Sequence, residues 1–152
     1  MVDVVLIVTA VTSGLMAGLF FAFSACVMLA LGQVDDRVFI DTMQRINRLI
    51  QNPVFGLVFV GSLLGSIAVA VLELTGDPRL DVLVGAVLTL VTMLITFTVN
   101  IPLNNRIDAA GPADAVADPK AVRLAFEPRW VRFNHLRTLL STAGFALYCV
   151  GL

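Results

Sequence analysis

The longest apolar run constrains the fold of this chain most: residues 4–31 contain no ionisable side chain other than Cys26. About 20 consecutive apolar residues are enough for a helix to cross the hydrocarbon core of a bilayer. Two more apolar runs, 54–72 and 82–99, are shorter but close to this length, and a still shorter run, 138–152, follows them. These runs predict transmembrane helices, so the lipid bilayer is the expected partner of most of the surface.

The composition agrees with this prediction, since 59% of the 152 residues are hydrophobic and 14% are charged. Soluble domains have roughly 45–50% apolar and about 25% charged residues. We therefore predict an all-α fold, an integral membrane four-helix bundle that forms a single transmembrane domain over residues 1–152. The predicted spans are 4–31, 54–72, 82–99 and 136–152.

Two of these spans need comment. No Lys or Arg precedes the first run, so it is predicted to be a retained span and not a cleaved signal peptide. The last apolar run has only 15 residues from Thr138 to Leu152. It is long enough to cross the membrane only if the segment with Arg137 is also drawn to the membrane boundary.

Helix boundaries are marked by capping residues and prolines. Asn52-Pro53 places a capping residue before a proline at the first helical position, which predicts the start of the second span. The turn at 75–78 separates the second span from the third, which is expected to end at Asn100-Ile101-Pro102. Residues 108–120 contain Gly-Pro and Asp-Pro pairs and are predicted to form a surface loop.

Residues 38–50 have charged side chains on one side of a predicted helix and apolar side chains on the other. Such a helix is expected to lie along the cytoplasmic membrane interface, between the first and second spans. Asn47 falls within the apolar arc, where its amide would need an internal hydrogen-bond partner.

Basic residues lie almost entirely in the first and third connections, whereas the opposite side carries only Arg79. Since positive charge is retained in the cytoplasm, we predict that both termini lie outside and the long connections inside, in the plasma (inner) membrane. The basic residues of these two connections are Arg37, Arg45, Arg48, Arg106, Lys120, Arg123, Arg129, Arg132 and Arg137.

Several classes of function are disfavoured. A net charge of -1 offers no basic surface to nucleic acid. Cys26 and Cys149 lie in different apolar runs, without the spacing of a zinc site. One histidine, His135, cannot supply a bis-histidine haem or a two-histidine iron site. We therefore predict no metal and no cofactor, with a haem bound through His135 as the alternative, and homo-oligomer formation stays open.

Polar residues within the apolar runs point to one end of the predicted bundle. An uncompensated polar group in hydrocarbon costs free energy, so these side chains are expected to face the bundle interior. At about 100° per residue, Thr96 and Asn100 share one stripe of the third run, and Trp130, Asn134 and Arg137 share one face of the fourth. The sequence places this stripe and this face toward the cytoplasmic end.

Other side chains are expected to join this cluster. Phe20 and Ser24 share a face of the first run, and the amides Asn47, Asn52 and Asn104 lie toward the same end. Two interpretations follow. In one, the amides cap helices, Trp130 anchors at the interface and Arg137 extends to lipid headgroups. In the other, the cluster is a pocket with Arg137 as its fixed positive charge.

The sequence resembles the anthrone oxygenase-like membrane proteins, many of which were catalogued only as a domain of unknown function. The resemblance covers nearly the whole chain, and its ordered motifs are Phe20-Phe21-Ala22-Phe23-Ser24 with Val27-Met28, Met43-Gln44-Arg45-Ile46-Asn47, Gln51-Asn52-Pro53-Val54-Phe55, Asn100-Ile101-Pro102-Leu103-Asn104, and Trp130-Val131-Arg132-Phe133-Asn134-His135-Leu136-Arg137.

This resemblance implies a four-helix membrane domain and, for some members, oxidation of an anthrone to an anthraquinone with O2. Such an enzyme would act on a small apolar, polycyclic aromatic substrate, with catalytic Arg137, Asn134 and His135. Substrate binding would fall to Asn47, Asn52, Asn100, Asn104, Trp130, Phe20, Ser24 and Thr96. The helical phase of His135, about 100° from the face of Arg137, argues against its role as the base.

A different class of function is the alternative. The polar stripe would then specify helix packing in a small non-catalytic scaffold or accessory subunit, or the pocket would hold a lipid or small molecule without chemistry. A proton-coupled transporter is disfavoured because the spans carry no carboxylate at mid-membrane.

Overall fold

A computed structural model describes residues 2–152, and within this part of the chain all regular structure is helical. The elements in chain order, where η marks a π-helical segment, are α1 Val2–Ala22, η1 Phe23–Val27, α2 Met28–Leu31, α3 Asp36–Ile50, α4 Pro53–Thr75, α5 Leu80–Ile95, η2 Thr96–Asn100, α6 Ile101–Ala109 and α7 Pro119–Val150.

Three continuous helical runs are long and apolar enough to cross a membrane: Val2–Leu31, Pro53–Thr75 and Leu80–Ala109. The first joins α1, η1 and α2, and the third joins α5, η2 and α6. The chain is therefore an all-helical membrane protein. The second half of α7, which was predicted to be a fourth span, stays a prediction.

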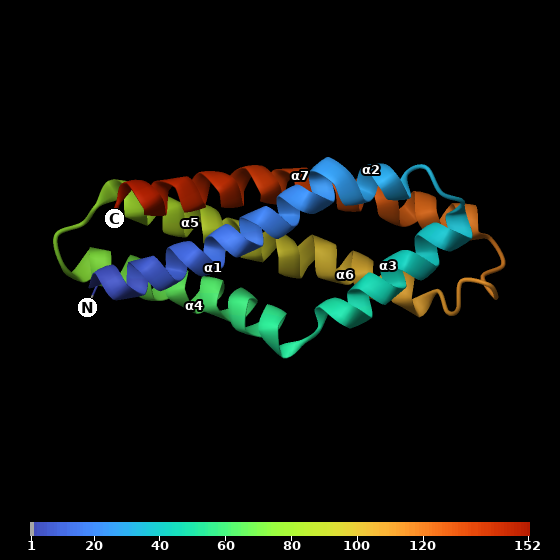
Figure 1. Cartoon of the computed structure of the whole chain (residues 1–152), viewed down its shortest axis with the longest axis horizontal. Coiled ribbons are helices and arrows are strands. Elements are labelled where there is room, and N and C mark those ends of the chain that lie inside the picture. Colours follow the sequence, from blue (N-terminus) through green and yellow to red (C-terminus); the bar gives the residue numbers. More distant parts are fainter. Residues whose placement is uncertain (1) are drawn as a thin grey trace.

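The long helices pack side by side in the order α1, α4, α5, α7, and α7 contacts α1 in turn. Both ends of the chain lie at one end of the molecule, and α3 and the loop 110–118 lie at the other (Figure 1). Helix α3 contacts α6 and α7 at that end. The molecule thus has a terminal half built with α4 and an opposite half built with α3.

Helices α3 and α4 meet at a corner at Gln51-Asn52 (Figure 1). Asn52 has an extended backbone, and its side-chain oxygen accepts a hydrogen bond from the backbone N–H of Phe55 at 3.0 Å. Pro53 occupies the first turn of α4. This confirms the predicted helix start, because the cap satisfies an N–H that has no partner within the helix.

The terminal half is closed by small side chains. A Cβ atom added to Gly85 would lie 3.0 Å from the carbonyl oxygen of Gly144, and one added to Gly65 would lie 2.5 Å from Thr9 Oγ1. Helices that approach this closely are typical of membrane bundles with small interface residues. Little space is left between α1, α4, α5 and α7 in this half.

Helix α3 agrees with the predicted amphipathic segment and begins two residues earlier than expected. Asp35 caps it by accepting hydrogen bonds from the N–H groups of Arg37 and Val38. Its apolar face is buried against α6 and α7 through Phe39 and Met43. The location of α3 at the membrane interface stays a prediction.

One predicted helix end is wrong. The third long helix does not stop at Asn100-Ile101-Pro102 but continues to Ala109. The π-helical segment η2 explains this, because its last bond joins the N–H of Ile101 to the carbonyl of Thr96. Pro102 follows where the hydrogen-bond ladder changes register, so its missing N–H is tolerated. The predicted loop 108–120 is correspondingly shorter and covers 110–118.

Helix α7 begins well before the segment predicted to enter the membrane. Asp118 caps it by accepting from the N–H of Ala121 at 3.0 Å, and Pro119 follows at the first helical position. The helix then continues through Pro128 to Val150. This cap-proline pair is the same start signal as Asn52-Pro53, so the sequence contained it although it was assigned to a loop.

Candidate active site

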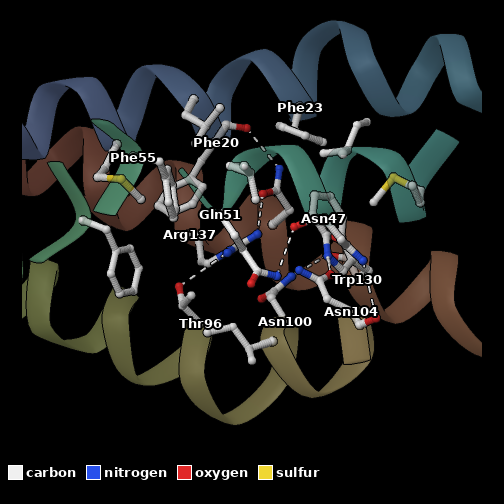
Figure 2. A pocket seen from close by; sticks show the side chains of 18 of the residues that line it. Phe20, Phe23, Asn47, Gln51, Phe55, Thr96, Asn100, Asn104, Trp130 and Arg137 are labelled. Atoms are coloured by element: carbon white, nitrogen blue, oxygen red, sulfur yellow. Dashed lines mark hydrogen bonds between the residues drawn. The ribbon is translucent and has the colours of Figure 1, made fainter. Parts of the chain in front are cut away.

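A cavity of about 350 Å³ lies at the junction of the two halves, where α3 and α4 meet beside the two π-helical segments. Ligand sites in proteins commonly have roughly 300–1,000 Å³. Figure 2 shows side chains from five parts of the chain directed toward this space. The apolar walls are formed by Met16, Leu19, Phe20, Phe23, Met43, Ile46, Ile50, Phe55, Phe59, Ile101 and Trp130, and the polar lining by Asn47, Gln51, Thr96, Asn100, Asn104, Asn105, Asp108, Asn134 and Arg137.

Arg137 lies at the centre of the polar lining and is only 4% exposed. Its Nη2 donates to Asn134 Oδ1 at 2.8 Å, and its Nη1 donates to Thr96 Oγ1 at 3.4 Å. The guanidinium carbon is 4.3 Å from the ring centroid of Phe20 and 5.4 Å from that of Trp130. Within residues 2–152 no carboxylate forms a salt bridge with it. Aromatic faces and neutral oxygens alone surround this charge.

Asn134 ties Arg137 to the first helix. Its Nδ2 donates to the backbone oxygen of Phe20 at 3.0 Å and to Ser24 Oγ at 2.8 Å. Ser24 in turn shares a hydrogen bond of 2.9 Å with Thr138 Oγ1. Because both Asn134 donors are used, its Oδ1 is fixed in position to accept from Arg137. Ser24 does not line the cavity and acts as a support for Asn134.

Asn100 and Trp130 connect η2 to α7. Asn100 Nδ2 donates to the backbone oxygen of Trp130 at 3.4 Å, and Trp130 Nε1 donates to Asn104 Oδ1 at 2.8 Å. Asn100 is 1% exposed. The predicted polar stripes of the third and fourth runs therefore face each other across the cavity.

Two buried polar atoms in this cluster have no hydrogen-bond partner in the described chain: Asn100 Oδ1 and Arg137 Nε. Leaving such a group unpaired costs roughly 1–3 kcal/mol, and more for a charged group. A donor and an acceptor without partners, on two side chains that line one cavity, favour a polar group of a ligand at this place.

The other end of the cavity is marked by Asn47 and Asp108. Asn47 Nδ2 contacts the backbone oxygen of Asn104 at 3.4 Å and Asp108 Oδ1 at 3.3 Å. The internal partner expected for Asn47 is therefore present. Twelve residues separate Asp108 from Thr96, which is about 18 Å along a helix. The Asp108 carboxylate forms no salt bridge with Arg137.

Sequence reasoning did not identify Asp108 or Gln51 as cavity residues. Asp108 was assigned to a loop because the helix was expected to end at Asn100-Ile101-Pro102. Gln51 donates from Nε2 to the backbone oxygen of Asn47 at 3.1 Å, at the corner between α3 and α4. The continuous helical phase from Asn100 to Asp108 was the signal that could have revealed the carboxylate.

Three predicted site residues lie outside the cavity: Ser24, which supports Asn134, and His135 and Asn52. His135 is on an exposed face of α7 and does not line it, as its helical phase indicated. Asn52 is exposed and caps α4, with a further bond from its Nδ2 to the backbone oxygen of Leu49 at 2.9 Å. Phe20, Asn47, Thr96, Asn100, Asn104, Trp130, Asn134 and Arg137 are the predicted residues that do line it.

Comparison with known families supports the resemblance noted in the sequence. A sequence model of the family described as anthrone oxygenase matches residues 43–147. Comparisons with curated proteins and with solved structures gave no match. The matched region covers well over half of the chain and contains the polar residues of the cavity from Asn47 to Arg137. The chain therefore belongs to the anthrone oxygenase family.

Proposed function

We propose that this protein is a membrane-embedded oxygenase that uses O2 to oxidise a small polycyclic aromatic substrate, an anthrone or a close analogue, in the cavity beside Arg137. One observation carries the proposal: a guanidinium that is 4% exposed lies between aromatic rings without a carboxylate partner. A buried charge without a counterion is costly. An anionic group that forms on a bound aromatic molecule would compensate it.

The reaction balances without an added reductant. An anthrone carries a methylene carbon opposite its ring carbonyl. Loss of one methylene proton gives an enolate, which passes one electron to O2, and the two radicals combine to a peroxide at the former methylene carbon. Proton uptake, loss of the second C–H proton and cleavage of the O–O bond then release water and leave a carbonyl. One anthrone and one O2 give one anthraquinone and one water.

Each part of the cavity supports one requirement of this reaction. Arg137 provides a fixed positive charge for the enolate oxygen, in surroundings of low polarity where such stabilisation is strong. Phe20 and Trp130 offer ring faces for a flat substrate. The apolar walls keep water from the reactive intermediates. The proposal includes no metal or cofactor.

The proposal also includes an arrangement in the membrane. Helix α7 would form a fourth span from about Arg137 onward, α3 would lie along the cytoplasmic interface, and both termini would face the outside of the plasma membrane. The basic residues of the two long connections support this orientation. The location of both chain ends at one end of the molecule is compatible with it (Figure 1).

Cysteine labelling tests the arrangement. In a background with Cys26→Ser and Cys149→Ser, Asp77→Cys should react with a membrane-impermeant maleimide added to intact cells. Asp114→Cys should react only after the cells are opened. The reverse pattern would contradict the orientation, and equal labelling of both sites in intact cells would contradict a membrane crossing by the helical run between them, Leu80–Ala109.

Anthrone oxidation tests the chemistry. Membranes that contain the protein should consume one O2 for each anthraquinone formed, measured with an oxygen electrode and by absorbance, above the rate of membranes without it. Arg137→Ala should abolish the excess rate while the protein stays inserted. An inserted wild-type protein without activity would favour the scaffold or binding-protein alternative.

A further inference from the structure

We infer that Asn100 and Arg137 together bind a hydroxyl group of the ligand, so that the cavity selects the enol tautomer of its substrate over the keto tautomer. The assignment of the substrate as an anthrone rests on the proposed function, but the hydroxyl site rests on the geometry alone. Asn100 would be a specificity-determining residue, and Arg137 would serve both binding and oxyanion stabilisation.

The inference starts from the hydrogen-bonding character of the two unpartnered atoms. Arg137 Nε carries a hydrogen and can only donate, whereas Asn100 Oδ1 can only accept. A ketone or an ether oxygen would accept from Arg137 and leave Asn100 unpaired. An ammonium group would donate to Asn100 and leave Arg137 unpaired. A hydroxyl group both accepts and donates, so it satisfies both atoms with a single oxygen.

The orientation of both side chains is set by other contacts. Asn100 Nδ2 faces the backbone oxygen of Trp130 at 3.4 Å, so rotation of the amide by 180° would oppose two acceptors. Arg137 is held through Nη1 by Thr96 and through Nη2 by Asn134. Nε is therefore the one guanidinium nitrogen without a partner, and Oδ1 is the unpartnered acceptor of Asn100.

Both groups also lie close to the same aromatic residue. Asn100 bonds to the backbone of Trp130, and the guanidinium carbon of Arg137 lies 5.4 Å from the Trp130 ring centroid. Figure 2 shows the two side chains converging from η2 and α7 on one part of the cavity. Both side chains line the same cavity, and the hydroxyl group is assigned to the space between them.

Selection of the enol explains how the reaction can proceed without a side chain that acts as a base on carbon. Among the described residues that line the cavity, Asp108 is the only carboxylate, and it lies about 18 Å along the helix from Thr96. The enol has already lost the methylene proton by tautomerisation and carries a hydrogen on oxygen instead. It is thus the tautomer that reaches the reactive state without a side chain that removes a proton from carbon.

The oxidation of the enol balances as before. The enol gives its O–H proton and one electron to O2, which forms an aryloxyl radical and a hydroperoxyl radical. These combine at the ring carbon opposite the oxygen to give a hydroperoxide. Loss of water from the hydroperoxide, with cleavage of the O–O and C–H bonds, gives the quinone. Asn100 Oδ1 accepts the O–H hydrogen bond before this step, and Arg137 stabilises the oxygen as the proton leaves.

Binding of non-oxidisable probes tests the inference. Trp130 is the only tryptophan, so quenching of its fluorescence reports occupancy of the cavity. Purified protein in nanodiscs should bind 1-naphthol about ten- to a hundredfold more tightly than 1-methoxynaphthalene, because the ether cannot donate to Asn100. Equal affinity of the wild-type protein for the two probes would overturn the inference.

Two substitutions test whether the preference for 1-naphthol depends on Asn100. Asn100→Leu should bring the affinity ratio of the two probes close to one, and an unchanged ratio would overturn the role of Asn100. Asn100→Asp places a carboxylate beside Arg137, so the protein should bind both probes at least tenfold more weakly. Wild-type affinity for 1-naphthol in this variant would contradict the site. The two probes partition differently into lipid, but this difference is the same for every variant. It therefore cancels when the affinity ratio of the two probes is compared between variants.

The outcome separates this inference from the proposed oxygenase function. Preference for 1-naphthol that depends on Asn100, without oxidation of anthrone, would support the hydroxyl site and reject the oxygenase. Oxidation of anthrone by a protein that lacks the preference would reject the hydroxyl site and leave the oxygenase proposal standing.

Discussion

Arg79 lies in the terminal half and Arg137 lies where the two halves meet, and the two residues show what a guanidinium does with and without a carboxylate. Arg79 donates to Glu73 through Nε at 3.0 Å and to the backbone oxygen of Gly151 through Nη1 at 2.8 Å. Arg137 has only neutral hydrogen-bond partners, and its Nε has none among the described residues. The first arrangement joins helix ends, and the second leaves binding capacity for another molecule.

The surroundings of the two arginines differ in the same way. The hydrogen bond that Arg79 donates to the Glu73 carboxylate raises the pKa of Arg79 further above its ordinary value, so Arg79 stays charged at any physiological pH. Around Arg79 the helices touch through glycines such as Gly85 and Gly144. Around Arg137 two π-helical segments and the corner between α3 and α4 leave a cavity. The terminal half is therefore marked by close packing and by polar groups that hydrogen-bond to one another. The candidate active site is marked by polar groups without partners.

Removal of the Arg137 charge should have the largest effect on activity. Arg137→Gln should reduce kcat/KM for anthrone by about 10²–10³, the loss typical of one oxyanion-stabilising donor. The melting temperature should not fall, since an uncompensated buried charge is removed. Oxygen uptake and a thermal shift assay in detergent measure the two quantities. Full activity would remove Arg137 from the mechanism.

The matched change in the terminal half should act on stability instead. Glu73→Gln breaks the pair with Arg79 and should cost roughly 2–4 kcal/mol, less than a fully buried pair because the Arg79 side chain is 35% exposed. Activity per folded molecule should be unchanged. Loss of activity at full occupancy of the folded state would show that the two halves are coupled.

The tight helix contacts in the terminal half predict that added side-chain volume there lowers stability. Gly85→Ala places a Cβ 3.0 Å from the Gly144 carbonyl, where the backbone cannot give way, and should destabilise the protein by about 1–3 kcal/mol. Gly56→Ala is the control, because a Cβ there meets nothing within 4 Å. The control should be neutral or stabilising by about 1 kcal/mol. Equal melting temperatures for the two variants would contradict the close approach of α5 and α7.

Helical phase was sufficient to predict much of this comparison, because residues three or four apart share a face whatever the rest of the fold. It grouped Asn100 with Thr96, and Asn134 with Arg137, and in the structure Arg137 bonds to Thr96 from the first group and to Asn134 from its own. Phase does not reveal how far apart two helices lie or where a helix is π-helical. Helix spacing and π-helical geometry determine the cavity, its corner at Gln51-Asn52 and the continuation of the helix past Asp108. Rules based on local sequence patterns could not predict these three features.

The pairing of Arg79 with Glu73 was also outside what periodicity can show. The two residues flank the turn at 75–78 and meet because the chain reverses there. A rule based on spacing within one helix does not describe contacts across such a chain reversal. Spacing within one helix does account for the pair of Arg45 and Asp41, which are four residues apart on α3 and form a salt bridge of 2.7 Å.

His135 should show the smallest effect, and it tests the boundary of the candidate site. The residue lies next to Asn134 in the chain but on an exposed face of α7, outside the cavity. A side chain that neither contacts the substrate nor supports Arg137 should change kcat/KM less than twofold when replaced, so His135→Gln is expected to match the wild type in oxygen uptake. Purified protein should also show no haem absorption near 400 nm that depends on His135. A haem band lost in the variant would move the chemistry to the outer face of α7, and the contrast between the two arginines would then no longer locate the active site.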